Sequence, residues 1–220
     1  MMDAKHSDAR SAIFASIREN LAASAAFNSA HQENPDQPDW ESSSNLAKWD
    51  LLETFRNSLD LVGATCVFVE NESEAADRLS EMVMNPSAKK IVVSDSELVR
   101  RLVKTAKIEA IENASRGELF SSDFGITSAQ WAIAETGTLV LESGAERHRL
   151  VSLVPAVHVC VLTAVSIRAS MAEILELVDP DTNRTITFIT GASRTSDIEL
   201  TLAIGVHGPG DLRVIVIKDQ

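Results

Sequence analysis

The residues whose types could carry chemistry gather in three stretches in the second half of the chain. The first is AETGT, residues 134–138, between two apolar runs. Glu135 offers a carboxylate, and Gly137 would let a ligand approach the main chain closely. Thr136 and Thr138 add two hydroxyls. These groups could act as a base, a nucleophile or hydrogen-bonding partners, although a hairpin turn with a solvated carboxylate would also explain them.

The second stretch, ERHRLVSLVPAVHV (residues 146–159), combines arginines with a histidine. An arginine can bind a planar carboxylate through two parallel hydrogen bonds, so Arg147 and Arg149 are candidates for holding a small acid. His158 lies inside the apolar run that follows them. The simpler interpretations are a solvated loop for the arginines and, for His158, a buried histidine bonded to one backbone carbonyl.

The third stretch begins with GASRTSD at residue 191, directly after the apolar run ITFIT, and has the highest density of polar groups. A loop of this kind at the carboxyl end of a parallel strand is where open α/β sheets bind ligands. The candidate binding residues are Gly191, Ser193, Arg194, Thr195, Asp197, Glu199 and His207. A well-capped turn, in which Asp197 and Glu199 bond backbone amides or pair with Arg194, is the alternative.

Metal and cofactor patterns are missing from the sequence. The third stretch matches neither the Walker A nor the GxGxxG pattern, and the five histidines form no HxH or HExxH. We therefore expect no metal in this chain. Cys66 and Cys160 each lie in an apolar run, which predicts buried thiols in a reducing cytosol. Without a CxxC pair, the chain is not expected to hold an iron–sulfur cluster of its own.

The composition excludes several classes of partner. The formal net charge is −12 at pH 7, which disfavours both nucleic acid and anionic membrane surfaces. An acidic ligand would need a local cluster of positive charge. The N-terminal residues contain no apolar leader, and no apolar run reaches about 18 residues, so we expect no membrane span and a cytoplasmic location.

The N-terminal part of the chain reads as an appendage. Apolar residues recur every fourth position within residues 8–27, which predicts an amphipathic helix. Residues 28–45 are polar with two prolines and read as a linker. We therefore expect a helical arm and linker over 1–45 and an α/β domain over 46–220. The apolar face of the arm needs a partner, and a second copy of the chain could supply it.

From residue 46 onward, helical and strand patterns alternate. Helices are predicted over residues 46–62, 72–85, 95–106 and 168–178. Strands are predicted over residues 64–70, 89–94, 156–162 and 186–190. This alternation predicts βαβ units and an α/β fold, with a mostly parallel sheet and flanking helices. Residues 131–143 read instead as two short strands around Thr136-Gly137, and residues 198–204 with 212–219 predict a β-hairpin near the C-terminus.

Three segments resemble proteins of the LUD-domain family: AIAETGTLVL (132–141), the run from Arg149 to Leu162, and TFITGASRTSDIE…GVHGPGDLRVIVIKD (187–219). The resemblance is strongest over residues 125–219, where SRTxDIE followed by GVHGP is distinctive. It implies a NagB/RpiA/CoA-transferase-like fold, that of the sugar-phosphate isomerase and CoA-transferase group. It also implies a place in a bacterial system that oxidises L-lactate to pyruvate, as the small subunit beside partners that carry iron–sulfur clusters. Gln130 departs from the family pattern, which has an aspartate there.

Three functions are compatible with these observations. In the first, the chain binds lactate, pyruvate or a related small anion, while partners move the electrons; its binding residues would be Ser193, Arg194, Thr195 and Arg149. In the second, it is a free-standing isomerase or CoA-transferase-like enzyme, because Glu135-Thr136-Gly137 has the Glu-x-Gly form of the nucleophile in CoA transferases. In the third, it is an assembly subunit with structural loops. The first reading places the SRTSDIE loop at the floor of an anion pocket that faces the AETGT turn.

Overall fold

The computed structural model describes residues 15, 16, 18, 48–84, 90–143, 149–178, 185–196, 202–204 and 208–218. The chain divides into two compact units, Met1–Ser42 and Ser43–Gln220, and every element described below belongs to the second. The predicted arm helix and linker fall almost entirely outside the described residues. The domain boundary expected after residue 45 therefore stays a prediction.

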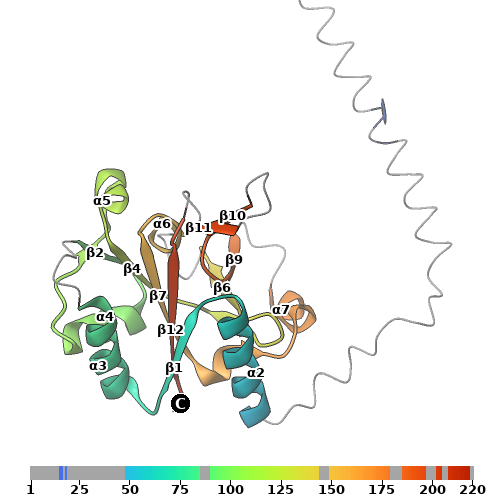
Figure 1. The fold of residues 1–220 in the computed structure, drawn as a ribbon, viewed down its shortest axis with the longest axis horizontal. Coiled ribbons are helices and arrows are strands. Elements are labelled where there is room, and N and C mark those ends of the chain that lie inside the picture. The colour runs from blue at the N-terminus through green and yellow to red at the C-terminus, as the bar shows by residue number, and fades with distance from the viewer. Residues whose placement is uncertain are drawn as a thin grey trace, which may run out of the picture. The chain divides into compact units, whose positions relative to one another are not determined.

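A six-stranded, all-parallel sheet forms the centre of the second unit (Figure 1), in the order β1-β12-β7-β4-β2-β3. Its strands are β1 (Thr65–Val69), β2 (Ile91–Val93), β3 (Ile111–Glu112), β4 (Phe124–Ser128), β7 (Val157–Thr163) and β12 (Asp211–Ile217). β7 and β12 are almost continuously apolar, as is typical of parallel strands covered on both faces. The sheet and its helices confirm the α/β fold predicted from the alternating pattern.

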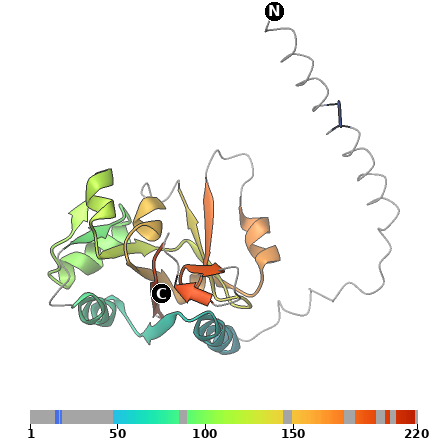
Figure 2. The same cartoon turned by 45° about the horizontal axis from the view of Figure 1, so that its top comes forward.

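Helices α3 (Glu72–Val83) and α4 (Glu97–Thr105) pack against one face of this sheet. The Asn71 side chain accepts a hydrogen bond from the Glu74 N–H at 3.0 Å and so caps the start of α3. Leu79 of α3 and Leu102 of α4 are fully buried there, against sheet residues such as Ile126. Figures 1 and 2 both place this pair of helices far from α7 (Met171–Leu177).

A second, four-stranded sheet covers part of the other face, in the order β8-β5-β6-β9. Its strands are β5 (Trp131–Ile133), β6 (Thr138–Glu142), β8 (Ile167–Arg168) and β9 (Ile186–Thr190). Its inner side, together with helix α2 (Lys48–Leu61), shares one apolar core with β1, β7 and β12. Its outer side carries α7, where Ile174 packs on Ile133 and Val140. The short helices are α5 (Arg116–Phe120), α6 (Arg149–Leu153) and the 3-10 helix η2 (Ala164–Ser166).

The antiparallel elements partly correct the sequence prediction. β5 and β6 pair around Thr136-Gly137, as expected. The C-terminal hairpin, however, joins β10 (Arg194–Ser196) to β11 (Leu202–Ile204), whereas β12 pairs in parallel with β1 and β7. The residues of β12 are buried on both faces, which suits a central parallel strand better than a hairpin arm. β9 also pairs antiparallel, with β6, so the loop after it does not follow a parallel strand.

Candidate functional site

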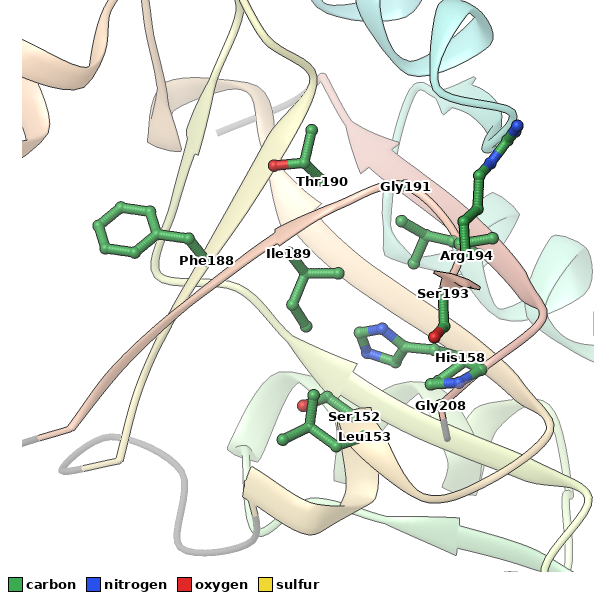
Figure 3. Close-up of a pocket in the computed structure, with 13 residues that line it drawn as sticks. Ser152, Leu153, His158, Phe188, Ile189, Thr190, Gly191, Ser193, Arg194 and Gly208 are labelled. Carbon is green, nitrogen blue, oxygen red and sulfur yellow. The ribbon is translucent and has the colours of Figure 1, made fainter. Parts of the chain in front are cut away.

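A pocket of about 320 Å³ lies between the parallel sheet and β9 (Figure 3). Its floor includes His158 of β7 and Leu212 of β12, which are neighbours in the sheet register. β9 and the loop after it line one side, and α6 and the residues before β12 line the rest. Since His158 and Leu212 are each the second residue of their strand, the pocket lies at the amino ends of these parallel strands.

His158 is the most unusual residue of this pocket. Its side chain is buried, with 1 % exposure, and Nε2 lies 2.8 Å from the hydroxyl oxygen of Thr127 on β4. Nδ1 has no hydrogen-bond partner among the described residues. Burial lowers the pKa of His158 from 6.5 to about 3, so the imidazole is neutral near pH 7. The simpler interpretation, a buried histidine bonded to a backbone carbonyl, is thus corrected in its partner, which is a threonine hydroxyl, and Nδ1 is buried without a partner among the described residues.

Gly125 of β4 allows helix α6 to pack beside this histidine. It is the register neighbour of His158, and a Cβ at this position would collide with the carbonyl oxygen of Val151 in α6. The close packing brings buried Ser152 to the pocket, where its hydroxyl donates to the Arg149 carbonyl oxygen at 2.8 Å. A glycine on β4 thus determines how near α6 comes to the imidazole.

Gly191 and Ser193, two of the residues predicted to bind a ligand, do line the pocket. Gly191 has a φ of +78°, and a Cβ there would lie 2.6 Å from the Val62 carbonyl oxygen, so the turn requires glycine. The Ser193 N–H donates to the Pro209 carbonyl oxygen at 2.8 Å. The Ser193 hydroxyl points toward the imidazole of His158 (Figure 3).

Arg194 also lines the pocket, but its guanidinium group lies at the rim. The side chain is exposed, and Nη2 donates a long hydrogen bond of 3.4 Å to the Val62 carbonyl oxygen. Figure 3 shows the guanidinium group pointing away from His158, toward the end of α2. In this conformation the guanidinium group of Arg194 and the imidazole of His158 do not face the same point of the pocket.

Glu135 lies outside this pocket. Its Oε1 accepts a hydrogen bond from the Met171 N–H, at the first residue of α7, at 3.0 Å. Its backbone carbonyl oxygen accepts one from the Ser58 hydroxyl at 3.3 Å. The AETGT turn therefore places this carboxylate at the start of a helix.

A row of hydroxyls connects the AETGT turn to β9. Thr136 Oγ1 lies 2.7 Å from Thr138 Oγ1, which lies 2.8 Å from Thr190 Oγ1. Thr190 lines the pocket, whereas Thr136, Gly137 and Thr138 do not. The row thus connects the turn to the last residue of β9, directly before Gly191, and the turn does not line the pocket.

The other predicted site residues are placed as follows. Arg149 is the first residue of α6, where it is exposed and outside the pocket lining. Thr195 belongs to β10, but the structure does not describe its side chain. Asp197, Glu199 and His207 lie outside the described residues, as does Arg147.

Thr127 and Ser152 are pocket-associated residues that sequence reasoning missed. Thr127 shares the short strand FGITS with Ser128, and Ser152 is the one hydroxyl residue of the helix RLVSL; each looks like an ordinary buried polar residue. The available signal is the alternation in β4, which puts Thr127 on the same face as Gly125. It becomes informative only when the pairing of β4 with β7 is known.

Comparison with known proteins gives one consistent family. The model of the LUD domain matches residues 52–217. An uncharacterized protein of Neisseria meningitidis is 35% identical over 136 residues, which cover 58% of each chain. Lactate utilization protein C of Deinococcus radiodurans is 41% identical over 106 residues, which cover 47% of this chain and 50% of that protein. The chain thus spans only 58% and 50% of the lengths of these two relatives.

Longer alignments and a solved structure agree with these matches. Lactate utilization protein C of a Geobacillus species is 27% identical over 205 residues, which cover 84% of this chain and 85% of that protein. The crystal structure of a DUF162 family protein from Deinococcus radiodurans superposes with a TM-score of 0.64. That structure is 27% identical in sequence and covers 78% of this chain and 99% of its own.

Proposed function

This chain belongs to the LUD domain family, and from that membership we propose that it is a component of a bacterial L-lactate utilisation system. Several similar proteins carry the name Lactate utilization protein C, which supports this role. Within that system, the chain binds a small organic anion, lactate or pyruvate, in the pocket that contains His158. Partner subunits with iron–sulfur clusters then move the electrons.

The observation that carries the binding proposal is the free ring nitrogen of His158. A buried polar atom without a partner costs about 1–3 kcal/mol, and native structures contain few of them. Nδ1 of His158 is such an atom within the described part of the chain, and its ring borders the pocket. A ligand with a polar group at this point would satisfy Nδ1. The Ser193 hydroxyl, which points toward the imidazole, could contact the same ligand (Figure 3).

Charge complementarity for an anion would come from Arg194. The whole chain has a net charge of −12, so an acid must be held by a local positive charge. Among the described residues that line the pocket, Arg194 is the one with an ionised side chain. Its long 3.4 Å hydrogen bond to Val62 and its exposure make a rotation toward a bound carboxylate inexpensive.

The described part of this chain also bears on where the iron–sulfur clusters of such a system would lie. In the described part of the chain, no three His, Cys, Asp or Glu side chains come together as metal ligands. Cys66 and Cys160 are both buried, and burial raises the pKa of the Cys66 thiol to about 12. We propose that partner subunits hold the clusters and that this chain supplies the acid-binding pocket. No described helix has the length and apolar character of a membrane span.

A thermal-shift panel tests the binding proposal. Purified full-length protein is heated with L-lactate, pyruvate, a sugar phosphate or CoA. A ligand present at about one hundred times its Kd adds about 2.7 kcal/mol, which raises the Tm of a chain of this size by roughly 5 to 10 °C. We expect such a rise with lactate or pyruvate.

Three variants locate the binding site in the same panel. His158→Gln retains a polar group near Thr127 but removes Nδ1, and Arg194→Ala removes the rim cation; each should reduce the ligand-induced rise. Arg100→Ala is the matched control, because Arg100 is an exposed arginine paired with Glu112 away from the pocket, and it should keep the full rise. No rise with any ligand in the wild-type protein would contradict the binding proposal.

A further inference from the structure

His158 and Thr127 form a buried side-chain pair beneath the pocket. Both are 1 % exposed, and 2.8 Å separates Nε2 from the threonine hydroxyl oxygen. Within the described residues, that contact is the one hydrogen bond of either side chain. The positions of the two shareable hydrogens therefore determine what His158 presents to the pocket.

A neutral imidazole allows two arrangements of these hydrogens. If Nε2 carries the ring hydrogen, it donates to Thr127, and the hydroxyl hydrogen of Thr127 then has no acceptor. Nδ1 would also lack a donor, so two buried groups would be unsatisfied. If Thr127 instead donates to Nε2, its hydroxyl hydrogen is satisfied, and Nδ1–H is the single group without a partner. Because each unsatisfied buried group is costly, the second arrangement is favoured.

We propose that Thr127 donates its hydroxyl hydrogen to Nε2 of His158, and that His158 thereby presents Nδ1–H to the pocket as a neutral hydrogen-bond donor. The group of the ligand that meets it must be an acceptor, that is, a carboxylate or carbonyl oxygen and not a hydroxyl hydrogen. This ligand assignment rests on the proposed function. Thr127 does not line the pocket, so it acts as a positioning residue that sets the tautomer of His158.

The geometry of the pocket agrees with a neutral donor at this point. The imidazole is buried, and the register neighbours of His158 are Gly125 on β4 and Leu212 on β12. Burial lowers its pKa, so the ring does not supply a positive charge. A hydrogen bond from a neutral donor to a carboxylate is strong when water is excluded. Two groups would thus bind the acid: the buried Nδ1–H of His158 at the floor of the pocket and the guanidinium group of Arg194 at its rim.

The tautomer can be observed directly, without any ligand. Full-length protein labelled with ¹⁵N-histidine is studied by long-range ¹H–¹⁵N NMR, and the signal that is lost in His158→Gln identifies His158. We expect the Nδ1–H form in the wild-type protein and in Thr127→Ser, which keeps the hydroxyl. Thr127→Val has nearly the same shape but no hydroxyl, and its Nδ1–H population should fall. An Nε2–H form in the wild-type protein would overturn the inference.

Ligand affinity gives the second readout. Calorimetric titration with lactate and pyruvate should show binding about tenfold weaker in Thr127→Val, and close to wild-type in Thr127→Ser. A Thr127→Val protein that is folded and binds the acid as tightly as wild-type overturns the positioning role. A wild-type protein that has Nδ1–H but binds neither acid contradicts the proposed function and leaves the tautomer assignment in place. The two failures are therefore distinguishable.

Discussion

Burial of His158 has a measurable consequence for stability. The unfolded histidine has a pKa near 6.5, whereas burial lowers the pKa in the folded chain to about 3. Between these values, the unfolded chain binds a proton that the folded chain does not bind. The free energy of unfolding therefore falls as the pH falls through 6.5 toward 3, and this contribution is fully present only above 6.5. Linkage predicts a loss of about 2 kcal/mol between pH 7 and pH 5 from this single residue.

His158→Gln is the control for this prediction, because glutamine does not titrate. Urea unfolding at pH 7 and pH 5 should show a larger loss of stability for the wild-type protein than for the variant. All other titrating groups are the same in both proteins, so they cancel in the difference. Equal losses in both proteins would mean that His158 is accessible to protons in the folded state.

Glu135 allows a residue-scale test between the structural and nucleophilic interpretations of the AETGT turn. Its Oε1 accepts the Met171 N–H at 3.0 Å, and an amide oxygen can do the same. Glu135→Gln should therefore cost only a few tenths of a kcal/mol, whereas Glu135→Ala should cost about 0.5–1 kcal/mol in chemical unfolding. In a reconstituted lactate-oxidising system, Glu135→Gln should keep its activity. Loss of turnover in a stable Glu135→Gln protein would support the nucleophile instead.

Among the elements, the contact between β4 and α6 is the one that shapes the pocket. A Cβ on Gly125 would collide with the Val151 carbonyl oxygen and lie 2.8 Å from Pro155 Cγ. Gly125→Ala should therefore push α6 outward and destabilise the fold by about 1–3 kcal/mol. Because Ser152 moves with the helix, ligand binding should weaken as well. Urea unfolding and the thermal-shift panel measure these two effects.

Gly117→Ala is the matched control for Gly125→Ala. Gly117 lies in α5, and a Cβ there meets nothing within 4 Å. Alanine is the better helix former, so this variant should be neutral or up to about 1 kcal/mol more stable. If both glycine variants behaved alike, the close packing of α6 on β4 would not be what restricts residue 125.

The sequence predicted those helices and strands whose pattern of apolar residues follows from which of their own faces are buried. The helix pattern of residues 46–62 and the apolar run of 156–162 correspond to α2 and β7 with small shifts at the ends. The pairing of β12 was not visible locally, because an apolar strand gives no sign of its neighbours. For the same reason, β9 read as another parallel strand, although its partner is antiparallel β6.

At the scale of the whole molecule, the candidate site exists only where the two sheets meet. Polar density identified Gly191 and Ser193, which line the pocket. It could not identify Thr127, because the contact with His158 joins residues 31 positions apart. Nor could it place the pocket at the amino ends of the strands, since the usual rule for open sheets points to the carboxyl ends. Long-range pairing determines both features, and the sequence records it only indirectly.

The N-terminal arm supplies a prediction about the whole chain. The described core clusters are built from residues between Leu51 and Ile217. Deletion of residues 1–45 should therefore leave the Tm of the remaining domain within a few degrees. The amphipathic pattern of the arm needs an apolar partner, and we propose that a second copy of the chain provides it. Size-exclusion chromatography with light scattering should show self-association of the full chain and a monomer after the deletion.

Substitutions within the arm test whether self-association depends on its apolar residues or only on the presence of residues 1–45. Ile13→Asp together with Ile17→Asp keeps every residue of the arm and linker but interrupts the apolar stripe. This double variant should be monomeric and should unfold at the wild-type temperature. An unchanged mass after the deletion would assign self-association to the α/β domain. A large fall in Tm would instead show that the arm completes the core of the domain, which would contradict the boundary expected after residue 45.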